Sequence, residues 1–405
     1  MTPVAVSHKE LVTCRSFRRC SGVRSTVGAV RVEWADAVRT GTMSTMTAVA
    51  TRTFVRSDFV IIGGGAAAVA LAGFTRFVGG GVVLTFLCAA VAVTLLASLV
   101  GRSVEQLGDR FGPGATGVLQ SALGNLPELF IALFALKAGL VEVVQAALIG
   151  SILANLLLVL GLCFLVGGLR HGTQKLGSGR ARSIIVLMVL SVAALVLPSL
   201  ASFVHAPAAE HEDTLSLIVS AILLLLFALT LPASLKRTSS APVEKGMQQE
   251  PPRWPIALAL GLLALAAVLA AFVSDWFVHA LEPAMQALNI SEAFAGLVIV
   301  AIAGNAVENV VGVQLAAKNR SEYAFSVVIN SPLQIALVLA PVLVILSQLL
   351  GLTALTLVFS PMLIVSVAIA VILSAFITFD GESNWIEGAA LIAVYAIIAS
   401  TFWWG

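Results

Sequence analysis

The chain has 405 residues, of which 59% are hydrophobic and 11% are charged, whereas about a quarter of the residues in soluble domains are charged. Its mean hydropathy of +1.02 excludes an ordinary soluble globular protein. The formal net charge of +2 provides no basic surface for nucleic acid, so we expect no nucleic-acid partner.

Residues 1–57 differ in composition from the rest of the chain. They contain nine Arg or Lys residues against three acidic residues, and no long apolar run. A secretory signal would need an apolar segment directly after its basic residues. This stretch is therefore predicted to be a basic, disordered N-terminal tail.

From residue 59 onward, eleven apolar segments are each long enough to cross the roughly 30 Å hydrocarbon core as a helix. A helix satisfies its own backbone hydrogen bonds in lipid, and the segments lack the alternating polarity of barrel strands. We therefore predict an all-α polytopic membrane protein with about eleven transmembrane helices. The predicted helices span 59–76, 81–100, 115–137, 142–168, 183–204, 214–234, 255–280, 292–317, 322–350, 353–378 and 384–403.

The charges in the loops predict the orientation of these helices. The loop after the fourth helix and the polar stretch 236–254 are rich in Arg and Lys, whereas the loop at Glu210–Asp213 is acidic. The positive-inside rule then places the N-terminus and both basic loops in the cytoplasm. The predicted organisation is the first helix with a first half at 58–235, a cytoplasmic loop at 236–254 and a second half at 255–405. We expect an integral protein of the cell (inner) membrane.

The two halves contain an internal repeat. Gly124–Ser151 and Gly304–Ser331 align without a gap at an offset of 180 residues, and they share a polar set that chance rarely produces inside apolar helices. The offset covers five predicted helices, an odd number, so the two copies have opposite orientations. Inverted repeats of this kind build secondary transporters with a binding site near the bilayer midplane. The identical pairs are Gly124/Gly304, Asn125/Asn305, Glu128/Glu308, Glu142/Glu322, Ile149/Ile329 and Ser151/Ser331.

Glu128 and Glu308 each lie about midway along a predicted membrane helix. An ionised carboxylate at that depth costs several kcal/mol unless it is protonated, paired or bound to a cation. Neither helix has a Lys or Arg near its Glu, and Lys137 and Lys318 are close to helix ends. The two carboxylates are therefore predicted to bind a proton or a metal cation.

Neutral oxygen ligands accompany these carboxylates in both copies. Asn125 and Asn305 precede the glutamates by three residues and so share their helix faces, while Ser151 and Ser331 lie on the next helices. This is a hard, all-oxygen donor set, which suits Ca²⁺ better than the transition metals that favour His or Cys. Two carboxylates also neutralise one divalent ion.

Several motifs in order along the chain resemble the calcium/proton antiporters, the cation/proton exchanger branch of the calcium/cation antiporter superfamily. The matching stretches are GNLPELFIALFALKAG, VVQAALIGSILANLLLVLG, GNAVEN, LQIAL and DGESNWIEGAALIAVY. The resemblance implies one extra N-terminal helix followed by two inverted five-helix repeats, and export of calcium against inward proton flow by alternating access. It places the essential acidic residues at Glu128 and Glu308 and adds Asn155 and Gln334 to the polar ligands.

Calcium and protons are thus the expected substrates, the lipid bilayer is the expected surroundings, and no resident cofactor or catalytic residue is predicted. A sodium/proton or potassium/proton antiporter would use the same two carboxylates and remains the alternative. A channel more often repeats in parallel around a pore axis. An intramembrane protease would need a Ser/His or paired-Asp set, and the HExxH motif is missing from the sequence.

Overall fold

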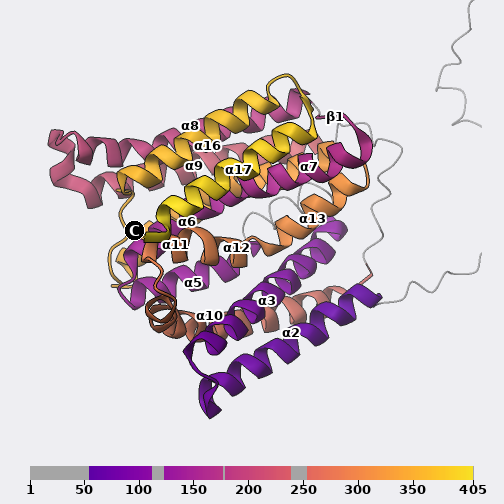
Figure 1. Cartoon of the computed structure of the whole chain (residues 1–405), viewed down its shortest axis with the longest axis vertical. Helices are drawn as coiled ribbons and strands as arrows, with labels where there is room; N and C mark the ends of the chain where they lie inside the picture. Colours follow the sequence, from indigo (N-terminus) through magenta and orange to yellow (C-terminus); the bar gives the residue numbers. More distant parts are fainter. Residues whose placement is uncertain (1–53, 112–122, 177, 239–252, 405) are drawn as a thin grey trace, which may run out of the picture. The chain divides into compact units, whose positions relative to one another are not determined.

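The computed structural model describes residues 54–111, 123–176, 178–238 and 253–404, and these are helical for most of their length (Figure 1). Most of the predicted tail, the start of the predicted helix 115–137 and the centre of the polar stretch 236–254 lie outside the described residues. The α-helices are α2 Arg56–Phe74, α3 Val82–Phe111, α5 Leu126–Lys137, α6 Val141–Leu153, α7 Leu160–His171, α8 Ser178–Phe203, α9 Glu212–Thr238, α10 Ile256–Leu288, α11 Glu292–Phe294, α12 Ala301–Gly304, α13 Ala306–Ala317, α14 Ser321–Gln334, α15 Ala340–Leu349, α16 Pro361–Thr378 and α17 Trp385–Thr401.

Shorter elements interrupt or extend these helices. Four are single π-helical turns, η2 Thr75–Gly79, η3 Ala154–Val159, η5 Ala295–Val300 and η6 Ile335–Leu339, and two are 3₁₀ turns, η4 Pro207–His211 and η7 Phe402–Trp404. Two short strands, β1 Gln174–Lys175 and β2 Glu382–Ser383, pair in antiparallel fashion, with Gln174 opposite Ser383 and Lys175 opposite Glu382.

The described residues confirm an all-α membrane fold. Nine of their helices are long and apolar enough to cross a membrane, and a tenth span results if 292–304 and 308–317, which are bent by 61°, count as one. The remaining predicted span, 115–137, is described only from residue 123 onward. The large apolar side chains exposed on the outer helix faces fit contact with lipid.

Several helix ends are joined by contacts between the segments that follow or precede them. Strand β1 follows α7 and pairs with β2, which precedes α17. The ring nitrogen Nε2 of His171, at the end of α7, lies 3.0 Å from the carbonyl oxygen of Ala317 at the end of α13. Near the end of α3, Gln106 Oε1 accepts a hydrogen bond from the backbone N–H of Trp254. An even number of predicted spans separates the two partners of each pair. Because the chain crosses the membrane once at each span, both partners of a pair lie on the same side.

The opposite helix ends are joined in the same way. Ser291, before α11, donates a hydrogen bond to the carbonyl oxygen of Phe402 after α17, at 2.6 Å. Gln145, in α6, donates from Nε2 to the carbonyl oxygens of Thr356 and Val358, at 3.1 and 2.8 Å. These contacts fit the second side of the same alternating path.

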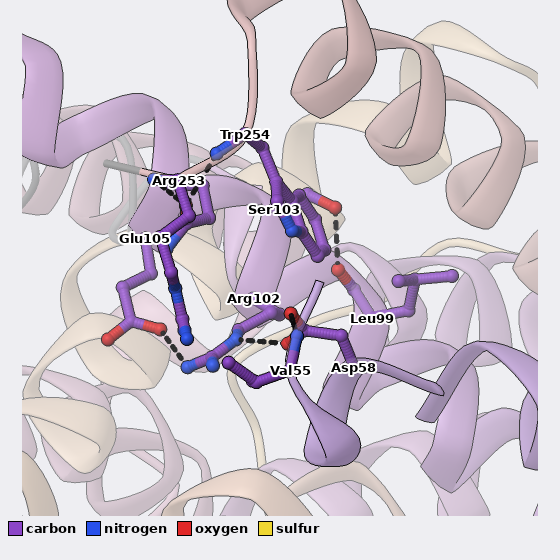
Figure 2. Close-up of polar contacts among 9 residues, drawn as sticks. Val55, Asp58, Leu99, Arg102, Ser103, Glu105, Arg253 and Trp254 are labelled. Atoms are coloured by element: carbon purple, nitrogen blue, oxygen red, sulfur yellow. Dashed lines mark hydrogen bonds and ion pairs between the residues drawn. The ribbon is translucent and has the colours of Figure 1, made fainter. Parts of the chain in front are cut away.

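An ion-pair network joins α2 to α3 (Figure 2). The carboxylate of Asp58 is fully buried and lies 3.2 Å from Nε of Arg102, and it also accepts the backbone N–H of Val55 at 3.0 Å. Arg102 contacts the exposed carboxylate of Glu105 at 3.0 Å. The predicted second helix, 81–100, ends too early, because α3 continues to Phe111. Arg102 lies in this extension, where Asp58 and Glu105 compensate its charge.

Replacing Arg102 with Met should destabilise the protein, because it leaves the buried Asp58 carboxylate without its cationic partner. We expect a cost of roughly 3 kcal/mol, visible as a lower melting temperature in detergent. Glu105→Gln is the matched control, since it removes the charge of the exposed partner of the same Arg102 and should cost less than about 1 kcal/mol. Equal small shifts in both variants would show that the buried pair contributes little.

The predicted helix 353–378 begins too early. Helix α16 starts at Pro361, and residues 351–360 are irregular although most of them are apolar. Hydropathy cannot distinguish such a segment from a helix. Its backbone groups are satisfied by side chains of neighbouring helices, as buried irregular backbone at membrane depth requires. Ser199 Oγ donates to the carbonyl oxygen of Leu357 and accepts from the N–H of Phe359, and Ser216 Oγ accepts from the N–H of Leu357.

Candidate functional site

The two copies of the repeat have the same backbone form. Helix α5 begins after a break at Asn125 (φ −94°, ψ 19°), and α13 begins after a break at Asn305 (φ −90°, ψ 18°). Both helices have 12 residues. Each is followed by a helix that ends in a π-helical turn, α6 with η3 and α14 with η6. The predicted continuous helix 292–317 is therefore wrong at this point, since a helical hydropathy pattern does not reveal a bend.

The breaks place Glu128 and Glu308 in the first turns of α5 and α13. The side chain of Glu128 is buried, and its Oε2 atom has no hydrogen-bond partner. Its carboxylate lies against Gly304 of the other repeat. Glu308 is half-buried, and the two carboxylates are within range of mutual Coulomb repulsion. In the described part of the chain neither is paired with Lys or Arg.

Three of the predicted polar residues meet in one hydrogen-bond network. Asn155, in η3, donates from Nδ2 to Oδ1 of Asn305 at 2.6 Å and lies 3.3 Å from Oγ of Ser331. The Ser331 hydroxyl donates to the same Asn305 oxygen at 3.2 Å. All three side chains are buried. Residues from both repeats are thus joined beside the two broken helices.

The other predicted residues lie near this network without joining it through their side chains. Ser151 is buried, and its backbone carbonyl accepts a hydrogen bond from Asn155 Nδ2 at 2.9 Å. Asn125 and Gln334 are half-buried. Ser151 and Glu128 also line the same narrow cavity, whose other walls are apolar side chains of α5, α6, η5 and η6.

The π-helical turns determine where several of these side chains lie. Asn155 is the second residue of η3, and Gln334 directly precedes η6. A π turn adds a residue to the helical repeat and so changes which side chains face the neighbouring helix, and such turns are frequent at functional sites. The two turns lie at nearly the same place in the repeats, since η3 begins at 154 and η6 at 335.

Two polar residues beside the break at Asn305, Thr94 and Asn309, were not predicted as site residues. Thr94, in α3, donates a hydrogen bond to the carbonyl oxygen of Ala303 at 3.3 Å, directly at the break between α12 and α13. Asn309, beside Glu308, has a buried Oδ1 atom without a hydrogen-bond partner. Thr94 lies in an apolar run outside the repeat and carries no sequence signal. Asn309 is the last residue of the GNAVEN motif, but it was not among the predicted ligands.

This arrangement provides two carboxylates and several neutral oxygens in apolar surroundings. Among the described residues, no group of three or more His, Cys, Asp or Glu side chains is arranged to hold a metal ion. The donors are therefore suited to a hard cation that accepts amide, hydroxyl and carbonyl oxygens besides carboxylate. They are equally suited to protons, because each carboxylate can bind one.

Comparisons with known proteins match most of the chain. A family model described as "Sodium/calcium exchanger protein" matches residues 81–236 and 258–404. The Ca²⁺/H⁺ antiporter of Aphanothece halophytica is 36% identical over 333 residues, which cover 78% of this chain and 89% of that protein. The Ca²⁺/H⁺ antiporter ChaA of Bacillus subtilis is 38% identical over 315 residues, covering 77% of this chain and 90% of that protein.

Solved structures give the same result for the fold. The match to the structure of native YfkE covers 85% of this chain and 99% of the YfkE chain, with a TM-score of 0.73 and 34% identity. The H⁺/Ca²⁺ exchanger CAX covers 84% of this chain with a TM-score of 0.65, and its 18% identity carries information on the fold alone.

Proposed function

Because this chain belongs to the sodium/calcium exchanger protein family, we propose that it is a secondary transporter that exchanges calcium for protons. Relatives that match more than three quarters of the chain carry the name Ca²⁺/H⁺ antiporter, which supports this assignment. Calcium ions and protons are its substrates, and its work is transport rather than catalysis. It needs no resident cofactor.

The observation that carries the proposal is the pair of uncompensated glutamates. Glu128 and Glu308 come from opposite repeats and lie within range of each other's charge, with no Lys or Arg paired to either in the described residues. Two such carboxylates repel when both are ionised, and a bound Ca²⁺ or protons remove the repulsion. Calcium and protons therefore compete for the same oxygens, as exchange of one for the other requires.

The neutral oxygens complete the calcium ligands in this proposal. Asn305 and Ser331, with Asn155, lie in one network beside the glutamates, and small movements of their side chains would direct oxygens at the ion. Ser151 and Asn125, the repeat counterparts of Ser331 and Asn305, are further ligands, and Gln334 is another. Calcium tolerates such an irregular shell, whereas Mg²⁺ demands a smaller octahedral one.

Transport proceeds by alternating access in this proposal, with one repeat moving against the other around the site. The N-terminus lies in the cytoplasm, as the basic loops predict, and the protein lies in the cell membrane. The end of the molecule that carries the β1–β2 pair is then the cytoplasmic end.

A sodium/proton or potassium/proton antiporter is the second candidate, because two carboxylates also bind monovalent cations. Purified protein in vesicles with an imposed pH gradient distinguishes the candidates when movement of Ca²⁺, Na⁺ and K⁺ is measured separately. We expect Ca²⁺ to move only when the gradient is present and to dissipate it. Movement of Na⁺ or K⁺ without Ca²⁺ would reject the calcium assignment, and cation movement that ignores the pH gradient would reject exchange.

A further inference from the structure

The carboxylate of Glu128 crosses from α5 to the opposite repeat and packs on Gly304. A Cβ atom at position 304 would lie 2.6 Å from both Cγ and Oε1 of Glu128, and 3.1 Å from its Cδ. Nonbonded carbon atoms attract best at about 3.5–4.0 Å. Any side chain at position 304 would therefore displace the carboxylate of Glu128.

The backbone at position 304 does not itself require glycine. Gly304 is the last residue of α12 and is not among the described glycines with positive φ. Other residues could therefore adopt its conformation without strain. The space that Glu128 occupies is the physical reason for glycine at this position.

Gly124 is the partner of Gly304 in the repeat, just as Glu308 is the partner of Glu128. If the two inverted halves exchange their conformations, the result is the opposite access state. The same exchange would place Glu308 on Gly124.

We propose that Gly304 and Gly124 are positioning residues that act alternately. Gly304 provides the space for Glu128 in the conformation described here, and Gly124 provides the space for Glu308 in the conformation of opposite access. This inference rests on the alternating-access function proposed above. The proposal explains why a glycine of the opposite half accompanies each glutamate. It predicts that a methyl group added at position 304 or 124 destabilises one of the two access states.

A double-mutant cycle on thermal stability in detergent tests the contact without any transport measurement. Gly304→Ala should lower the melting temperature by several degrees in the wild-type background. It should lower it equally in a Glu128→Gln background, because Gln has the same shape. The Glu128→Ala background removes the three atoms nearest to the added methyl group, so the decrease should be much smaller there. Equal decreases in all three backgrounds would overturn the proposed contact.

Gly261→Ala is the matched control for this cycle. Gly261 lies within α10, and a Cβ atom there would have no neighbouring atom within 4 Å. Because Ala favours helices over Gly, the control should not lower the melting temperature in any background. A decrease like that of Gly304→Ala would show that the effect is a general response to alanine in these helices.

Proton-driven calcium flux in vesicles tests the alternation. Gly124→Ala should slow exchange at least several-fold, because the added methyl group would occupy the space that Glu308 needs in the conformation of opposite access. Exchange at the wild-type rate would overturn the role of Gly124. If wild-type protein moved no calcium, the proposed function would fail, while the stability cycle on Gly304 would still be readable.

Discussion

Glu128→Gln and Glu308→Gln should each reduce proton-coupled calcium flux to the level of vesicles without protein. Glutamine keeps the length and hydrogen-bonding ability of the side chain, but it can neither neutralise a cation nor bind and release a proton near neutral pH. Both variants should still fold, because glutamine is uncharged and has the same shape as glutamate. Flux assays on reconstituted protein, with melting temperatures measured in parallel, check both parts of this expectation.

Glu142→Gln is the matched control for these two variants. Glu142 belongs to the same repeat but lies exposed in the first turn of α6. Its replacement should leave calcium flux close to that of the wild type. Near-normal flux in Glu128→Gln or Glu308→Gln would remove that residue from the site, and loss of flux in all three variants would show that the repeat is sensitive to any change.

Calcium added to the purified protein in weakly buffered detergent should release protons. In the proposed exchange, the empty site would hold protons on its carboxylates to avoid two buried charges, and a bound Ca²⁺ would displace them. Because low pH favours the protonated carboxylates, calcium affinity should rise as pH increases. By linkage, protons weaken calcium binding by the same factor by which calcium weakens proton binding.

A pH electrode or indicator dye measures this release, with a calcium titration at several values from about pH 6 to pH 8. The double variant Glu128→Gln/Glu308→Gln is the control and should release no protons. If the wild type released no protons at any of these pH values while still binding calcium, protons and calcium would not share the site.

The sequence predicted the helical membrane fold because apolar length is a strong signal in a chain with so few charges. It also predicted a set of polar residues for one site, because the same set recurs at an offset of 180 residues. That prediction places Asn305 and Ser331 close together, and the structure joins them by a hydrogen bond of 3.2 Å. Whether this group binds calcium remains a prediction.

Features that depend on contacts between distant segments could not be predicted. The irregular segment 351–360 and the extension of α3 to Phe111 depend on partners elsewhere in the chain, such as Ser199 for the irregular segment and Asp58 for α3. Hydropathy averages over a window and does not register those partners. The contact between Glu128 and Gly304 likewise involves no sequence pattern beyond the repeat itself.

The first and second halves also meet along α7 and α17, where glycines bring the backbones together. A Cβ atom on Gly161 would lie 2.8 Å from the carbonyl oxygen of Gly388, and one on Gly388 would collide with the backbone of Leu165. The β1–β2 pair and a 2.7 Å hydrogen bond from the N–H of Leu176 to the carbonyl oxygen of Gly381 fasten the adjoining loops. Two chain segments held this way cannot slide without breaking backbone hydrogen bonds. In the proposed transport cycle this region would stay fixed, and we expect the motion between the two repeats to take place in the helices that are not fastened to it.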